Sequence, residues 1–189
     1  MIKCNHDSGG LSICLDKKSF NIEEAKKKIE KSLKTDYFYV SREWPYKQIK
    51  PRILVEKYLE DKVDGELRDY KFFCFDGKAK LMFVAADRQD KNKETTFDFF
   101  DLDYNRIDVR NGHPNAEKPP HKPKNFKKMI ELAEKLAKGF THVRVDFYEV
   151  NGKIYFGELT LYHWGGLTPF EPEEWDEKMG EMLKLPEKK

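Results

Sequence analysis

The residues best suited to chemistry are charged side chains within two apolar segments late in the chain. The first segment reads RVDFY and contains Arg144 and Asp146, and the second reads YFGELT and contains Glu158 and Thr160. Side chains in a strand alternate between its two faces, so Arg144 and Asp146 share one face of the first segment. A carboxylate in so apolar a strand needs a partner, which makes these segments a candidate site.

The turn that joins the two segments determines whether their carboxylates meet. A two-residue turn at Asn151 and Gly152 pairs Val150 with Lys153 and leaves the carboxylates on opposite faces. A three-residue turn, with Gly152 in the left-handed conformation, instead pairs Val150 with Ile154 and brings the carboxylates together.

We predict the three-residue turn, in which Asp146 faces Glu158 and Arg144 faces Thr160. Two carboxylates across a strand pair repel one another unless a cation lies between them. Hard oxygen ligands suit Mg²⁺, which bridges one or two carboxylates to substrate phosphates. The alternative interpretation is that both carboxylates are solvated or paired with Arg144.

The first ten residues, MIKCNHDSGG, place Lys3 before a loop that ends in two glycines. Glycine lets backbone N–H groups approach an oxyanion closely, so one interpretation is a phosphate-binding loop. The other interpretation of this segment, taken without context, is a plain strand and turn.

Composition limits the class of protein. The chain has 189 residues, enough for one good core or for two small lobes. Its 36 basic and 34 acidic residues leave a net charge of only +2, so we expect no nucleic-acid partner. No apolar run approaches 18 residues, so we expect no membrane span.

The three cysteines predict a reduced, cytoplasmic protein. Cys4, Cys14 and Cys74 are odd in number and show no CxxC spacing. Reduced thiols are typical of the cytosol, and this spacing argues against a structural zinc site.

Hydrophobic periodicity predicts an α+β protein with two strand-rich portions, each of which carries one helix. Asn21 and Glu24 form a capping-box signature at the start of the first helix, and Gly139 ends the second. The second helix is expected to bury one face, formed by Phe126, Ile130, Ala133 and Ala137. We expect strands at 2–4, 11–15, 53–59, 69–75, 78–88, 141–150 and 153–161, helices at 22–34 and 125–138, turns at 64–65 and 76–77, and a proline-rich excursion at 111–124.

The order of these motifs resembles the ATP-grasp superfamily, most closely its TupA-like group, which is associated with teichuronopeptide and other polysaccharide biosynthesis. The matching stretches are IKCNHDSGG, SREWPYKQIKPRILVEKYL, DYKFFCFDGK, RVDFY and YFGELT, in family order over most of the chain. The resemblance implies an ATP-grasp fold, with nucleotide bound between two lobes of mainly antiparallel sheet plus helices. We expect a smaller lobe at 1–57 and a larger lobe at 58–189.

The resemblance also implies a role for individual residues. Lys3 is similar to the lysine that reaches the nucleotide phosphates, and the loop after it to the cover over them. The residues expected to bind ATP are Lys3, His6, Ser8, Gly9, Gly10, Glu56, Lys57, Tyr58 and Leu59. Those expected to act on the phosphates or the reacting carboxylate are Lys71, Arg88 and Arg144.

The magnesium ligands implied by the resemblance are Asp146, Glu158 and Thr160. Superfamily members usually have asparagine where this chain has Thr160, and a hydroxyl can also coordinate Mg²⁺ or bind its water. The segment that follows, Tyr162 to Gly166, lies close enough to line a pocket.

The activity implied by the resemblance is an ATP- and Mg²⁺-dependent carboxylate–amine ligase acting through an acylphosphate. We expect a small-molecule or polysaccharide-linked acceptor. The alternatives are a kinase of a sugar or other hydroxyl acceptor, and a nucleotide-binding module without turnover. Family members carry a further domain before the lysine strand, so this chain is either trimmed or a reduced protein that uses a partner or a simpler reaction.

Overall fold

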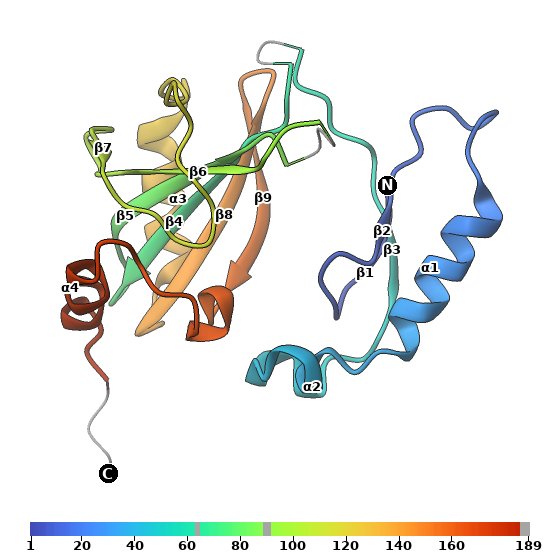
Figure 1. Ribbon diagram of the computed structural model, residues 1–189, viewed down its shortest axis with the longest axis horizontal. Coiled ribbons are helices and arrows are strands. Elements are labelled where there is room, and N and C mark those ends of the chain that lie inside the picture. The colour runs from blue at the N-terminus through green and yellow to red at the C-terminus, as the bar shows by residue number, and fades with distance from the viewer. Residues whose placement is uncertain (63–64, 89–91, 186–189) are drawn as a thin grey trace. The chain divides into compact units, whose positions relative to one another are not determined.

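The computed structural model describes residues 1–62, 65–88 and 92–185. The chain forms two compact units, Met1–Leu59 and Glu60–Lys189. Figure 1 shows the elements of each unit. Helices occur together with antiparallel sheets, in agreement with the predicted α+β class.

The first unit contains a three-stranded antiparallel sheet in the order β2-β1-β3. Its strands are β1 (Ile2–Cys4), β2 (Leu11–Ser12) and β3 (Ile53–Val55). The predictions of longer strands at 11–15 and 53–59 are wrong, because three-residue β1 is the partner of both and offers no further backbone groups. The residues of β3 are exposed.

Helices follow the first hairpin in this unit. The first is α1 (Ile22–Lys34), which begins and ends as predicted, and Asn21 Oδ1 accepts a hydrogen bond from the Glu24 N–H at 3.0 Å. After α1 come α2 (Tyr37–Ser41) and a 3₁₀ helix (Trp44–Gln48), which the periodicity did not predict. Such short helices contain too few turns to show a 3.6-residue repeat.

The second unit contains a six-stranded antiparallel sheet in the order β7-β6-β5-β4-β8-β9. The strands are β4 (Asp69–Phe75), β5 (Lys78–Ala86), β6 (Thr96–Phe100), β7 (Arg106–Ile107), β8 (His142–Val150) and β9 (Lys153–Thr160). The hairpin of β4 and β5 turns at Asp76 and Gly77, as predicted. The strands β6 and β7 were not predicted.

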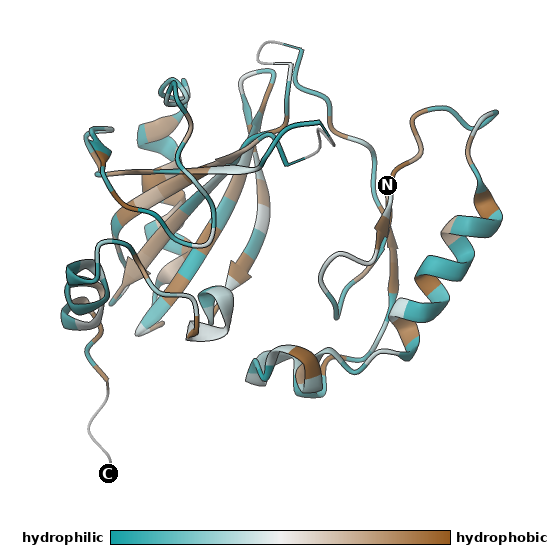
Figure 2. Ribbon diagram, viewed as in Figure 1, coloured by the Kyte–Doolittle hydropathy of each residue, from teal (hydrophilic) through white to brown (hydrophobic). Residues whose placement is uncertain are grey.

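One face of this sheet packs against α3 (Phe126–Ala137), which Figure 1 shows behind the central strands. The predicted apolar face of α3 is correct except at one position, where Met129 is fully buried and Ile130 only half-buried. Figure 2 shows the central strands to be largely hydrophobic, in agreement with their burial in the structure.

The opposite face of the sheet carries a second apolar cluster at one end. Phe73, Phe83 and Phe99 form its centre, and side chains of α4 (Glu174–Met182) pack against it. A 3₁₀ helix (His163–Gly166) precedes α4 in the chain. Phe170, which lies between the two helices in sequence, is buried in the same cluster. The sequence did not predict α4, so the expectation of one helix per unit is wrong.

The turn between β8 and β9 differs from the predicted one. Val150 pairs with Lys153, so the loop has two residues, and both Asn151 (φ 50°) and Gly152 (φ 75°) have a positive φ. Asn-Gly is the preferred sequence for this type of two-residue hairpin turn. The prediction of a three-residue loop is therefore wrong.

A β-bulge in β9 nevertheless restores the predicted pairing of the carboxylates. Phe147 pairs with Phe156 while Asp146 pairs with Glu158, so Gly157 is the extra residue. A Cβ atom on this glycine would lie 3.0 Å from the backbone oxygen of Asp146, which explains why the position is glycine. Arg144 faces Thr160 on the same pair of strands, as predicted.

The remaining expectations concern irregular segments. Residues 111–124 contain no helix or strand, as the four prolines predict. The predicted turn at 64–65 begins at a residue outside the described ones. Among the described residues, no helix has the length and apolar composition that crossing a bilayer requires.

Candidate active site

Six charged side chains form a continuous series of ion pairs on the face of the second sheet that is turned away from α3. We call this set the charged network, and it contains three cations and three carboxylates. Its members are Asp69, Lys71, Arg88, Arg144, Asp146 and Glu158.

The strand register explains why these side chains meet. Lys71 on β4 pairs directly with Asp146 on β8, and Asp69 lies two residues away on the same face of β4. Lys71 Nζ donates to Asp146 and lies 3.2 Å from Asp69 Oδ1. One lysine therefore joins two buried carboxylates.

Arg144 connects the central pair to β9. Its Nε and Nη2 donate to the two oxygens of Asp146 at 2.8 and 2.7 Å, a two-point contact that guanidinium geometry favours. Nη2 also lies 3.1 Å from Glu158 Oε1 and 2.9 Å from Thr160 Oγ1. The alternative interpretation, in which the carboxylates pair with Arg144, describes the structure, and the magnesium role stays a prediction.

Burial separates the two predicted acidic ligands. The side chain of Asp146 is 2% exposed and that of Glu158 is 57% exposed. Burial alone would raise the pKa of Asp146, but the charges of Lys71 and Arg144 outweigh it and hold that pKa below its usual value. Asp146 is therefore ionised at neutral pH, and Glu158 is open to solvent.

Arg88 stands at the other end of the charged network. Its Nη1 donates to Asp69 Oδ2 at 2.7 Å, and its side chain is 47% exposed. Burial and the Asp69 carboxylate raise the pKa of the neighbouring Tyr148, so this phenol stays protonated. Arg88 is the most exposed cation of the charged network.

His163 and Asn111 hold Arg144 from the side opposite Asp146. Arg144 Nη1 donates to His163 Nδ1 at 2.6 Å, and the protonated Nε2 donates to Asn111 Oδ1 at 2.7 Å. The Asn111 amide in turn donates to the carbonyls of Thr168 and Pro169, both at 3.0 Å. Burial, followed by the charge of Arg144, lowers the pKa of His163 to about 2.

Sequence reasoning found only part of this arrangement. The segment from Tyr162 to Gly166 was expected near the site because it follows the acidic strand, and His163 belongs to it. Asn111 had no such signal, because it lies 52 residues from His163 in the chain. Only the folded sheet brings the two side chains together.

The nine residues expected to bind ATP all belong to the first unit, whereas the expected catalytic and metal-binding residues all belong to the second. Lys3 forms an ion pair with Glu56 at 3.0 Å, and both side chains are partly exposed. Lys57 is exposed, and Tyr58 and Leu59 are half-buried.

The loop after β1 has an exposed part and a buried part. Ser8 and Gly9 are exposed, and Gly9 has a φ of 82°, which glycine adopts readily. His6 instead is 4% exposed and lies against Ser32 of α1. A Cβ on Gly10 would collide with the Ser32 hydroxyl, so the backbone packs closely there.

Comparison with known proteins gives one match. A protein-family model described as TupA-like ATPgrasp matches residues 1–184 of the chain. No match was found among curated proteins or among solved structures.

Proposed function

The chain belongs to the TupA-like ATP-grasp family, and from this premise we propose that it is an ATP- and Mg²⁺-dependent carboxylate–amine ligase. ATP-grasp proteins are in general ATP-dependent ligases and typically use ATP and Mg²⁺. The observation that supports the proposal most is the charged network, because it gathers three cations and three carboxylates on one sheet face.

The oxygen-bearing side chains of Asp146, Glu158 and Thr160 fit Mg²⁺. Asp146 and Glu158 pair across two strands, and the Thr160 hydroxyl lies 3.2 Å from Glu158 Oε1. This is a set of hard oxygen donors, and the exposed Glu158 gives an ion access from solvent. When bound, Mg²⁺ would neutralise the phosphate oxygens of ATP.

The three basic side chains would act on the transferring phosphoryl group. Phosphoryl transfer needs positioned positive charge more than covalent help. In the structure Lys71, Arg88 and Arg144 pair with carboxylates. A dication bound to those carboxylates would free the three basic side chains to bind phosphate oxygens. On binding, Mg²⁺ would thus take the place of the basic side chains at the carboxylates, and the phosphates of ATP would take the place of the carboxylates at the basic side chains.

The proposed reaction has two steps. An oxygen of the acceptor carboxylate attacks the γ-phosphorus of ATP, and ADP leaves with the electron pair of the broken bond. An amine then attacks the carbonyl carbon of the acylphosphate, loses a proton, and releases phosphate as the amide forms. The three basic side chains of the charged network stabilise the phosphate oxygens in the first step.

The first unit supplies the nucleotide contacts in this proposal. Lys3 and the exposed part of the loop after β1 bind the phosphates, and the segment from Glu56 to Leu59 binds adenine. Within that loop, the exposed Ser8 and Gly9 are the residues that reach the phosphates. Each unit then corresponds to one ATP-grasp lobe.

We propose that the acceptor belongs to cell-surface polysaccharide or peptide modification, as the TupA-like resemblance suggests. The experiment incubates the purified chain with ATP, Mg²⁺ and panels of uronic acids, amino acids and amines, and measures ADP release and product mass. The ligase predicts ADP release that requires both a carboxylate and an amine. A phosphorylated sugar without an amine would indicate a kinase, and binding of ATP without any product would indicate a module without turnover.

A further inference from the structure

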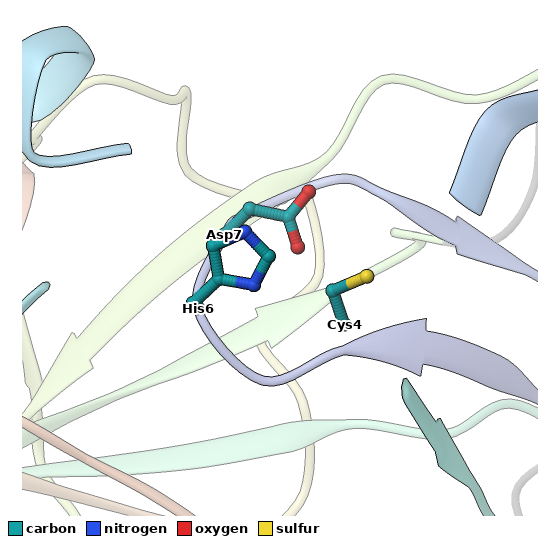
Figure 3. Close-up of side chains that lie close together, drawn as sticks. All are labelled: Cys4, His6 and Asp7. Carbon is teal, nitrogen blue, oxygen red and sulfur yellow. The ribbon is translucent and has the colours of Figure 1, made fainter. Parts of the chain in front are cut away.

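Three side chains of different ligand types meet where β1 passes into the loop after it. Cys4, His6 and Asp7 each offer one ligand atom, and these atoms lie within 4.8 Å of one another. Figure 3 shows a ring nitrogen of His6 turned toward Cys4, with the Asp7 carboxylate beside the same edge of the ring. All three residues belong to the first unit, whereas the charged network belongs to the second.

The tautomer of His6 leaves a bare lone pair in this cluster. Its Nε2 lies 3.1 Å from the Ser32 carbonyl oxygen, which can only accept a hydrogen bond, so Nε2 carries the proton. In the neutral imidazole Nδ1 then carries the lone pair, and it is buried without a partner among the described residues. A buried polar atom of this kind requires an explanation.

Ser32 of α1 orients two of the three side chains. Its carbonyl oxygen accepts from His6, and its hydroxyl donates to the Asp7 carboxylate. Ser32 is itself 5% exposed, so the packing of α1 holds its carbonyl and hydroxyl groups beside the cluster. Histidine ligands of metal ions typically donate their second N–H to a backbone carbonyl or a carboxylate, as His6 does.

We propose that Cys4, His6 and Asp7 bind a divalent transition metal ion, and that Zn²⁺ fits them best. A thiolate, a neutral imidazole and a carboxylate are a ligand set that zinc accepts, and their two negative charges balance the dication. The same set is a poor match for Mg²⁺, which prefers oxygen ligands. Three protein ligands leave one position for water or another small ligand.

The positions of the three residues allow the ligands to close around an ion. Bonds of about 2.0–2.3 Å separate the ligand atoms of a tetrahedral zinc site by about 3.3–3.8 Å. The separations of up to 4.8 Å therefore need to shorten by about 1 Å. Cys4 is held by strand pairing with Ile53, whereas Asp7 lies in the loop and is half-buried, so Asp7 can move and gives an entry path.

This site differs from the one that the cysteine spacing argues against. The cysteine spacing excludes a site of paired cysteines, whereas the present cluster uses one thiol together with His6 and Asp7. The test therefore measures metal binding directly, without nucleotide, so that its outcome is independent of the ligase proposal.

The experiment titrates Co²⁺, a spectroscopic substitute for Zn²⁺, into the reduced, metal-free full chain. We expect one equivalent to produce tetrahedral visible bands and a near-ultraviolet thiolate-to-cobalt band, both removed by one equivalent of Zn²⁺. Cys4→Ser and His6→Ala should abolish the thiolate band, whereas Cys14→Ser, which changes a thiol outside the cluster, should leave it unchanged. Ser32→Ala should weaken binding about tenfold or more.

Circular dichroism checks that each variant is folded. Cys4→His supplies a further control, because it keeps a ligand at this position and should retain the visible bands while losing the thiolate band. The absence of a thiolate band in the folded wild-type chain would overturn the proposal and leave a thiol–imidazole contact only. An unchanged band in folded Cys4→Ser would overturn it as well.

Discussion

Arg144 is the residue on which the charged network depends. Its side chain is 9% exposed and forms two hydrogen bonds with Asp146, whose side chain is 2% exposed. Removing one partner of a buried ion pair typically costs about 3–5 kcal/mol, because the other charge is left uncompensated. The guanidinium also contacts Glu158, Thr160 and His163, so a lysine cannot replace it.

The hydrogen bond between Arg144 and His163 makes the stability of the protein dependent on pH. Its pKa is lowered to about 2, so the unfolded chain binds a proton below about pH 6.5 that the folded chain excludes. The contribution of neutral His163 to stability is therefore complete above the pKa of histidine in the unfolded chain, and it is lost as the pH falls below that value. We expect the free energy of unfolding to drop between pH 7 and 5 by about 1–2 kcal/mol more in wild type than in His163→Gln.

Urea unfolding at the two pH values measures this difference. Glutamine at position 163 can accept from Arg144 and donate to Asn111 without titrating, so the variant isolates the proton. An equal pH dependence in wild type and His163→Gln would show that the neutral imidazole is not required.

At the scale of elements, the hairpin of β8 and β9 shows what the sequence can and cannot predict. The pairing of Asp146 with Glu158 was correctly expected, but for a wrong reason. The Asn-Gly turn has two residues, and Gly157 supplies the extra residue that the argument had assigned to the turn. A bulge depends on a local backbone contact, and hydrophobic alternation does not reveal such a contact.

Gly157 and Gly180 give a prediction of opposite sign for the same substitution. Gly157→Ala brings Cβ to 3.0 Å from the Asp146 oxygen and 3.3 Å from Tyr148, and we expect a loss of stability of about 1–3 kcal/mol. Gly180→Ala in α4 meets nothing within 4 Å and should gain about 0.5–1 kcal/mol. Thermal unfolding compares the two, and a loss that is equal in both variants would contradict the role of the bulge.

The other helices and strands were predicted correctly where the element is long and its apolar residues recur at a regular spacing. The predicted bounds of α1 were correct because the capping residue and the apolar stripe indicate the same helix. The prediction of β4 was correct at both ends and that of β5 at its start, because both strands are long and flank an Asp-Gly turn, whereas β5 ends at Ala86 and not at residue 88. The helices α2 and α4 and the strands β6 and β7 were missed, since each is short or takes its apolar contacts from distant parts of the chain.

At the scale of the whole molecule, the two units differ in the size of their cores. In the described part of the first unit, the buried apolar side chains are Cys4, Ala25 and Ile29. The second unit contains two large clusters, one on each face of its sheet. Stability follows buried apolar area, so the second unit should be the more stable.

Hydrogen exchange followed by mass spectrometry can test this difference. We expect the slowest amides in β4, β5 and β8, and markedly faster exchange in β1 and β3. Ligand-binding segments are commonly among the less stable parts of a protein, which agrees with the proposed role of the first unit in binding ATP. Equal protection in both units would contradict this expectation.

The charged network also relates the second unit to the proposed chemistry. Its three cations and three carboxylates balance one another, so ATP and Mg²⁺ would replace ion pairs that already exist. The central claim is that Glu158 is part of the metal site. Glu149 provides the matched control, because it lies on the same hairpin but on the opposite face of β8 from Asp146.

The most direct test is calorimetric titration of a nonhydrolysable ATP analogue, with and without Mg²⁺, into wild type, Glu158→Gln and Glu149→Gln. We predict that Mg²⁺ tightens binding in wild type and in Glu149→Gln, and that Glu158→Gln loses this gain while its fold is unchanged. Equal Mg²⁺-dependent binding in wild type and Glu158→Gln would contradict the account.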